Sequence, residues 1–156
     1  MTIALLALAV GFLAGLRTFM APTAVSWAAS AGALDPGQSF QFMGHRFTPW
    51  VFSLLAAFEL FNDKRPTTPS RTVPPQFAAR LLFGGLSGAT IGASGGMLFF
   101  GLVLGAIGAV AGTLGGAAAR ARLAAVFGSD RPAALIEDWV ALGLALVVVW
   151  TWSVTR

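Results

Sequence analysis

The chain has 156 residues, of which 56% are hydrophobic and only 10% are charged, and its mean hydropathy is +0.78. The charged fraction is less than half of the roughly 25% found in soluble domains, so an ordinary soluble fold is excluded. The net charge of +4 indicates arginine-rich loops beside a membrane rather than binding to nucleic acid. With no cysteine and one histidine, His45, thiolate and histidine-rich metal sites are excluded as well.

Six apolar segments predict an all-α, polytopic transmembrane helical bundle that forms one integral membrane domain, residues 1–156. The expected helices are, in chain order, Thr2–Leu16, Pro22–Leu34, Thr48–Asn62, Phe77–Ser94, Met97–Ala117 and Pro132–Val154. The first three are only about 20–22 Å long, against an apolar bilayer core of about 30 Å. The chain therefore has about six membrane segments, or five crossings with a re-entrant segment from Arg17 to Leu34.

Two polar connections have distinct expected roles. The segment 35–47 joins the second and third helices outside the membrane, and its phenylalanines are expected to lie on the membrane surface. The segment 63–76 is expected to be extended and stiff, because proline interrupts helices. Its four prolines are Pro66, Pro69, Pro74 and Pro75.

The positive charges predict the orientation of the bundle. The loops after the first, third and fifth helices carry eight basic residues, and the opposite side carries Arg46 and Arg156. Since cytoplasmic loops are enriched in arginine and lysine, the polar side is expected to face the cytoplasm and both termini the outside. The eight residues are Arg17, Lys64, Arg65, Arg71, Arg80, Arg120, Arg122 and Arg131.

Glycines spaced by four residues predict a close-packed helical hairpin, a glycine zipper, at residues 84–116. Glycine on one helix face lets two helix backbones approach closely. The packing residues are Gly84, Gly88, Gly92, Gly96, Gly101, Gly105, Gly108, Gly112 and Gly116. Gly95 and Gly96 are also expected to make the turn between the two helices, and Gly11 and Gly15 to extend the packing to the first helix. The packing lies within one subunit, between subunits of a homo-oligomer, or at a sliding surface.

A charged cluster is expected at the cytoplasmic ends of the helices. Glu59 and Asp63 share a helix face because they are four residues apart. Glu137 and Asp138 lie about 10 Å beyond the start of the sixth helix, where acids are costly and are usually paired or functional. The candidate substrate- or ion-binding residues are Arg17, Glu59, Asp63, Lys64, Arg71, Glu137 and Asp138.

Three interpretations of this cluster remain open. A structural ion-pair network would connect Arg17 to Glu137 or Glu59, and Arg71 to Asp138. In a gate for a solute, the basic residues would meet an anionic group, while the acids would couple protons or a cation. In an Mg²⁺-dependent enzyme acting on a lipid phosphate, the carboxylates would hold the metal. No catalytic signature supports the enzyme, so no catalytic residue or cofactor is predicted, and the identity of any metal stays open.

The pattern of these residues resembles the DUF4126 family of small bacterial membrane proteins. The resemblance begins with Gly15-Leu16-Arg17-Thr18 and Ala21-Pro22, and ends with the glycine hairpin and Glu137-Asp138. Its specific part is the stretch Asp63-Lys64-x-Pro66-x-x-Pro69-x-Arg71. The resemblance covers nearly the whole chain and implies a multi-pass protein of the bacterial inner membrane, without implying a mechanism.

Together these observations predict a small integral membrane protein with a charged cavity facing the cytoplasm. We expect it to be transporter- or channel-like for a small solute, an ion or a lipid headgroup. Its expected partners are the lipid bilayer, further copies of itself and a small anionic or cationic solute. The alternatives are the lipid-phosphate enzyme and a structural or assembly protein.

Overall fold

The computed structural model describes residues 3–63 and 72–154, and this part of the chain is all helical. It contains six α-helices and one 3-10 helix, without strands. They are α1 (Ile3–Leu16), α2 (Met20–Ser30), the 3-10 helix η1 (Gln38–Gly44), α3 (Thr48–Asn62), α4 (Pro74–Ala93), α5 (Leu98–Phe127) and α6 (Asp130–Val154). The expected all-α fold is therefore confirmed.

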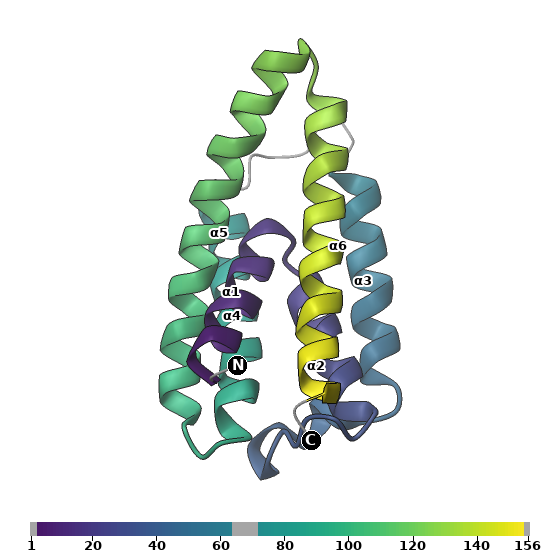
Figure 1. Ribbon diagram of the computed structural model, residues 1–156, viewed down its shortest axis with the longest axis vertical. Helices are drawn as coiled ribbons and strands as arrows, with labels where there is room; N and C mark the ends of the chain where they lie inside the picture. The colour runs from purple at the N-terminus through teal and green to yellow at the C-terminus, as the bar shows by residue number, and fades with distance from the viewer. Residues whose placement is uncertain (1–2, 64–71, 155–156) are drawn as a thin grey trace.

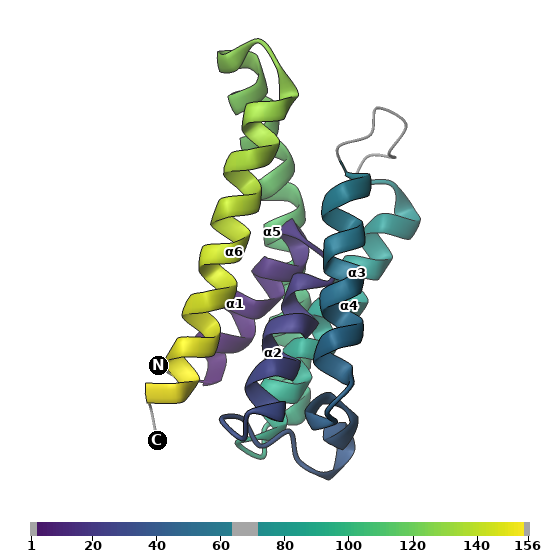
Figure 2. The same ribbon diagram turned by 90° about the vertical axis from the view of Figure 1, so that its right-hand side faces the viewer.

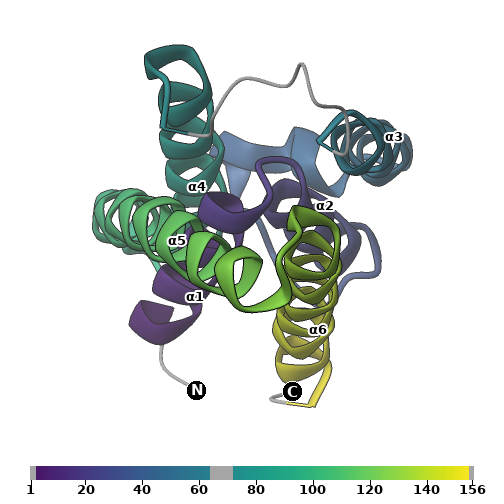
Figure 3. The ribbon, with the colours of Figure 1, turned by 90° about the horizontal axis from the view of Figure 1, so that it is seen from above.

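Successive α-helices run in alternating directions along the long axis (Figures 1 and 2). The turn between α5 and α6 forms the upper end of the molecule, and η1 lies at the lower end. The turn between α1 and α2 lies about halfway between them. Seen from above, α1, α4 and α5 form one group, and α2 lies beside α3 and α6 (Figure 3). The short first two helices therefore make a hairpin whose turn is in the interior of the bundle.

Helix α1 is the central element of the core. It is apolar on all sides, and Val10, Leu13 and Ala14 have no exposed surface. A helix without a polar face is buried inside a protein or a membrane. Because α2, α4, α5 and α6 pack against α1, its 14 residues need not match the thickness of a bilayer.

Glycines bring α4, α5 and α1 into backbone contact. A Cβ at Gly88 of α4 would lie less than 3.0 Å from the backbone of Gly101 and Gly105 on α5. On α5 as well, a Cβ at Gly108 would meet the backbone of α1. Real Cβ atoms do not come this close, so these positions exclude any larger residue without separating the helices. The three helices therefore pack as one block within the chain.

Among the expected packing glycines, Gly96 lies in a turn and Gly116 lies on a helix. Gly96 lies in the turn after α4 with φ of 71°, and a Cβ there would meet no atom within 4 Å. Its inclusion among the packing residues is therefore wrong, because it serves the left-handed turn conformation that glycine adopts easily. Gly116 is buried on α5.

Within the described part of the chain, two helices are long and apolar enough to cross a membrane, α5 and the Asp130–Thr151 part of α6. About six such segments were expected, whereas α1, α2 and α3 have only 14, 11 and 15 residues. Large apolar side chains also cover the outside of the molecule. Among them, Leu54, Phe99 and Trp139 are 71%, 80% and 71% exposed. Extended apolar surface of this kind points to a membrane protein.

Some helix ends differ from the prediction for identifiable reasons. Helix α4 begins at Pro74, so Pro74 and Pro75 form its first turn, where proline is tolerated. Both prolines were expected to lie in a non-helical segment. Helix α5 continues ten residues beyond Ala117 and ends at Phe127, before Gly128, which has φ of 66°. The segment 35–47 contains η1, which is anchored by the fully buried Met43. Pro66 and Pro69 lie outside the described residues.

Glycine packing can be tested by substituting Gly88 and comparing it with Gly115 on α5. We expect Gly88→Ala to lower the free energy of unfolding by about 1–3 kcal/mol, because the added methyl group overpacks the contact between α4 and α5. Gly115→Ala should be neutral or stabilising, since its Cβ has open space and alanine favours helix. Denaturant unfolding of the two purified variants in detergent measures this difference, and equal stabilities would contradict it.

Candidate functional site

The side chain of Arg17 lies at the centre of a buried ion-pair network. Arg17 follows α1 in the turn before α2, and only 1% of its surface is exposed. Its Nη1 donates a hydrogen bond to Asp63 at 2.6 Å, and its Nη2 donates to Asp138. One guanidinium thus connects the interior turn to the end of α3 and to α6.

Glu59 of α3 binds the start of α2. Its two carboxylate oxygens accept hydrogen bonds from the backbone N–H groups of Thr18 and Phe19, at 2.8 and 3.0 Å. Phe19 is the N-cap of α2 and supplies no side-chain cap of its own. The first N–H groups of a helix lack helical partners and carry partial positive charge, so a carboxylate is favoured there.

Arg80 of α4 binds the end of α1 in the complementary way. Its side chain is buried, and Nη1 donates to the carbonyl oxygens of Gly15 and Leu16 at 2.7 and 2.8 Å. A cation is favoured at this end because the last carbonyls of a helix carry partial negative charge. Nη2 of Arg80 also lies 3.7 Å from Oε1 of Glu59. Both helix ends at the interior turn are therefore satisfied by side chains of opposite charge.

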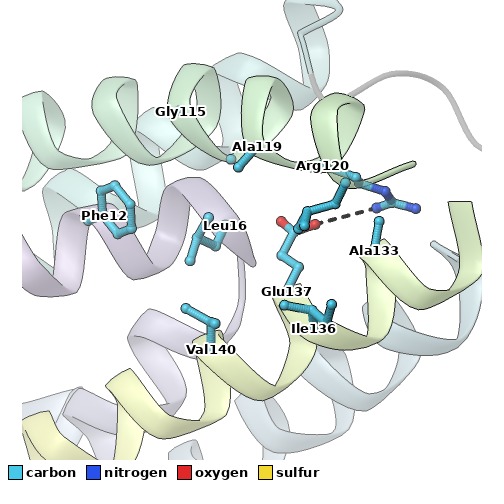
Figure 4. Close-up of a pocket in the computed structure, with 11 residues that line it drawn as sticks. Phe12, Leu16, Gly115, Ala119, Arg120, Ala133, Ile136, Glu137 and Val140 are labelled. Carbon is cyan, nitrogen blue, oxygen red and sulfur yellow. Dashed lines mark ion pairs between the residues drawn. The ribbon is translucent and has the colours of Figure 1, made fainter. Parts of the chain in front are cut away.

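Arg120 of α5 joins α3 and α6 to the same network. Its Nη1 donates to Asp63 at 2.9 Å, and its Nε and Nη2 donate to the two oxygens of Asp130 at 2.9 and 2.6 Å. Nη1 also lies 3.6 Å from Glu137, whose side chain is 7% exposed (Figure 4). The guanidinium is thus shared by three carboxylates.

The signs of the charges divide the helices into two groups. Among the described members of the network, the arginines belong to the block of α1, α4 and α5, and the carboxylates belong to α3 and α6. The arginines are Arg17, Arg80 and Arg120, and the acids are Glu59, Asp63, Asp130, Glu137 and Asp138. Electrostatic attraction therefore holds α3 and α6 against the block of α1, α4 and α5, whose own helices are packed through glycine contacts.

A pocket of about 310 Å³ lies beside the network between α3 and α4. The turn before α2 contributes Thr18 and Phe19 to it, while Glu59, Asp63 and Arg80 are among its polar walls. A solute in this pocket would lie against both charged groups that close the ends of α1 and α2. Within residues 3–63 and 72–154, no three acidic or histidine side chains are arranged to share a metal ion.

The structure brings together five of the predicted site residues, Arg17, Glu59, Asp63, Glu137 and Asp138. The direct ion pairs of Arg17 are with Asp63 and Asp138 rather than with the expected Glu137 or Glu59, and Glu137 attracts Arg17 without forming a direct ion pair with it. Lys64 and Arg71, including the expected pair of Arg71 with Asp138, lie outside the described residues.

Sequence reasoning missed Arg80, Arg120 and Asp130 as site residues. The charge asymmetry in the sequence places both arginines in loops. The available signal was their position within apolar, glycine-rich helices: Arg80 is six residues beyond Pro74, or about 9 Å by helical rise. An arginine at that depth requires a partner or a function.

Removal of Arg17 should destabilise the fold strongly. We expect Arg17→Gln to lower the free energy of unfolding by about 3–5 kcal/mol, because it leaves two carboxylates without their buried cation. Arg122→Gln is the matched control, since Arg122 is exposed on α5. Denaturant unfolding in detergent measures both, and an unchanged transition for Arg17→Gln would show that the network does not stabilise the fold.

The network should also make stability depend on acid. Burial alone would raise the pKa of Asp63, but the guanidiniums of Arg17 and Arg120 outweigh burial and hold this pKa below its ordinary value. A carboxyl whose pKa is lower in the folded state contributes stability above the unfolded-state pKa of about 3.9 and loses it as pH falls further.

We therefore expect the free energy of unfolding to decrease as pH falls from about 4 toward the depressed folded-state pKa of Asp63. The Asp63→Asn variant should show a smaller decrease over the same interval. Unfolding measured at several pH values checks this, and an identical pH dependence in both proteins would refute the role of Asp63.

Comparison with known proteins identifies the family of this chain. Residues 4–152 match the domain of unknown function DUF4126, which confirms the resemblance seen in the sequence. Neither the curated proteins nor the solved structures include a match. Because the match spans nearly all of its length, the chain belongs to the DUF4126 family.

Proposed function

We propose that this protein is a transporter- or channel-like membrane protein that moves a small solute, an ion or a lipid headgroup past the ion-pair network. The observation that carries the proposal is a buried arginine, Arg17, at an interior break between two helices of an apolar bundle. Ionisable groups are expensive at such depth and usually mark a pathway. Breaks in membrane helices are common substrate and ion sites in transporters.

The division of charge supports a gate at this position. Replacing buried ion pairs by apolar residues is often neutral or stabilising, so a network this large is weak evidence for a purely stabilising role. Attraction between arginines on one block and carboxylates on α3 and α6 gives a contact that a charged solute can compete for. In the proposed cycle, an anionic group meets the arginines while the released acids take up protons or a cation.

The membrane arrangement is part of the same proposal. The described basic residues at the network end outnumber Arg46 at the other, which supports a cytoplasmic location for the network. We propose the bacterial inner membrane, about six segments with the α1–α2 turn inside the bundle, and the glycine zipper as the rigid block. In a homo-oligomer, subunits would meet through other surfaces, such as the exposed Leu54 and Phe58 face of α3.

The proposal is tested with purified protein in vesicles of phosphatidylethanolamine and phosphatidylglycerol. The probes are a proton-sensitive dye inside the vesicles, radiolabelled inorganic phosphate, and fluorescent phosphatidylethanolamine. We expect the wild type to move at least one probe faster than protein-free vesicles. Glu137→Gln should fold and lose this activity, because it keeps the shape of the side chain and removes its charge.

Arg122→Gln is the control and should retain wild-type flux, since Arg122 is outside the network. Movement of none of the probes, combined with a large loss of stability in Glu137→Gln, would contradict transport. That result would instead support a structural role for the network.

A further inference from the structure

An apolar crevice lies between α1, α5 and α6 and ends at the ion-pair network (Figure 4). Phe12 and Leu16 line it from α1, and Ile136 and Val140 line it from α6. Its volume is about 160 Å³. The pair of Arg120 and Glu137 forms its polar end, so the crevice passes from purely apolar walls to a guanidinium and a carboxylate.

Small residues keep this crevice open. Gly115 and Ala119 line it from α5, and Ala133 lines it from α6. A Cβ at Gly115 would meet no atom within 4 Å, in contrast to the glycines that contact α1 and α4. Unfilled apolar space forfeits dispersion contacts, and a cavity of about 150 Å³ accommodates an apolar molecule the size of benzene. The crevice therefore suits a short length of hydrocarbon chain.

A second pocket of about 390 Å³ shares Arg120 with the crevice. Arg131 and Asp130 line it together with Arg120. Planar guanidinium groups match the geometry of phosphate, with two donors for two oxygens. Asp130 now occupies the outer donors of Arg120, but its side chain is 62% exposed, so water can readily solvate it after displacement.

We propose that the α5–α6 hairpin binds a phospholipid-like amphiphile, with its phosphate at Arg120 and Arg131 and part of its chain in the apolar crevice. The adjacency of an apolar space and two guanidiniums, joined at Arg120, carries this inference. It rests on the proposed function, which it deepens by naming a lipid phosphate as the class of molecule that reaches the network. The phosphate replaces the carboxylate of Asp130.

Binding is tested by thermal unfolding of the full-length protein in detergent with lysophosphatidic acid as the probe. Monoacylglycerol with the same chain lacks the phosphate, and inorganic phosphate lacks the chain. We expect lysophosphatidic acid to raise the melting temperature of the wild type, since a ligand of the native state stabilises it by mass action. The two partial probes should give much smaller shifts at equal concentration.

Variants separate the two parts of the site. Gly115→Leu should abolish the shift by filling the crevice without changing a charge. Arg131→Gln should weaken lysophosphatidic acid binding by about tenfold, the cost of one charge-assisted hydrogen bond. Asp130→Asn should tighten binding, because the competing carboxylate is gone. Arg122→Gln, on the exposed side of α5, should bind as the wild type does.

Equal shifts with inorganic phosphate and lysophosphatidic acid, unaffected by Gly115→Leu, would overturn the amphiphile site in favour of a free-phosphate site. No shift with any probe would also overturn it, as would weaker binding by Asp130→Asn. Binding is measured at equilibrium without a gradient. Absence of lysophosphatidic acid binding would therefore not contradict the transport of another solute. Conversely, binding without flux in vesicles would refute transport and retain the lipid site.

Discussion

The structure depends on how the chain satisfies the break between α1 and α2. Turning the backbone in the interior leaves carbonyl groups at the end of one helix and N–H groups at the start of the next. Arg80 binds the carbonyls and Glu59 binds the N–H groups, while Arg17 in the turn itself reaches Asp63 and Asp138. Without these groups, the buried turn would carry unsatisfied backbone dipoles. The residues that end the short helices are therefore the same residues that gather the charges of the other helices.

Two kinds of interaction hold the bundle, and they act on different helices. Glycine contacts hold α1, α4 and α5 together through short-range packing. A Cβ added at Gly88 or Gly108 would clash with the backbone of the neighbouring helix. Ion pairs hold α3 and α6 to that block at the network end, and such pairs depend on pH and on competing charges. Arg120 has an unusual position, because it belongs to the network and lines both the apolar crevice and the polar pocket.

Most helix positions could be predicted from hydropathy and proline alone. Helix α3 was predicted with the bounds Thr48–Asn62 that the structure has. The end of α5 could not be predicted, because Arg120 and Arg122 were interpreted as loop residues. The charge of Arg120 is compatible with a helix once Asp63 and Asp130 pair with it, and Arg122 is exposed. Likewise, proline was interpreted as an interruption at Pro74, where it begins α4 because the first helical turn needs no N–H group there.

The amino-acid sequence by itself determined that the protein is helical and apolar, and that its few charges gather at one end. It also determined which face of each glycine-rich helix is small, since spacing by four residues follows from the helical repeat. Only the tertiary structure decided which charges pair, because Arg17 and Asp138 are brought together across most of the chain by packing that no local pattern encodes. The same packing decided that Gly88 meets a neighbouring backbone while Gly115 faces open space. Periodicity tells which residues share a face, whereas the identity of the facing partner depends on how all the helices fit together.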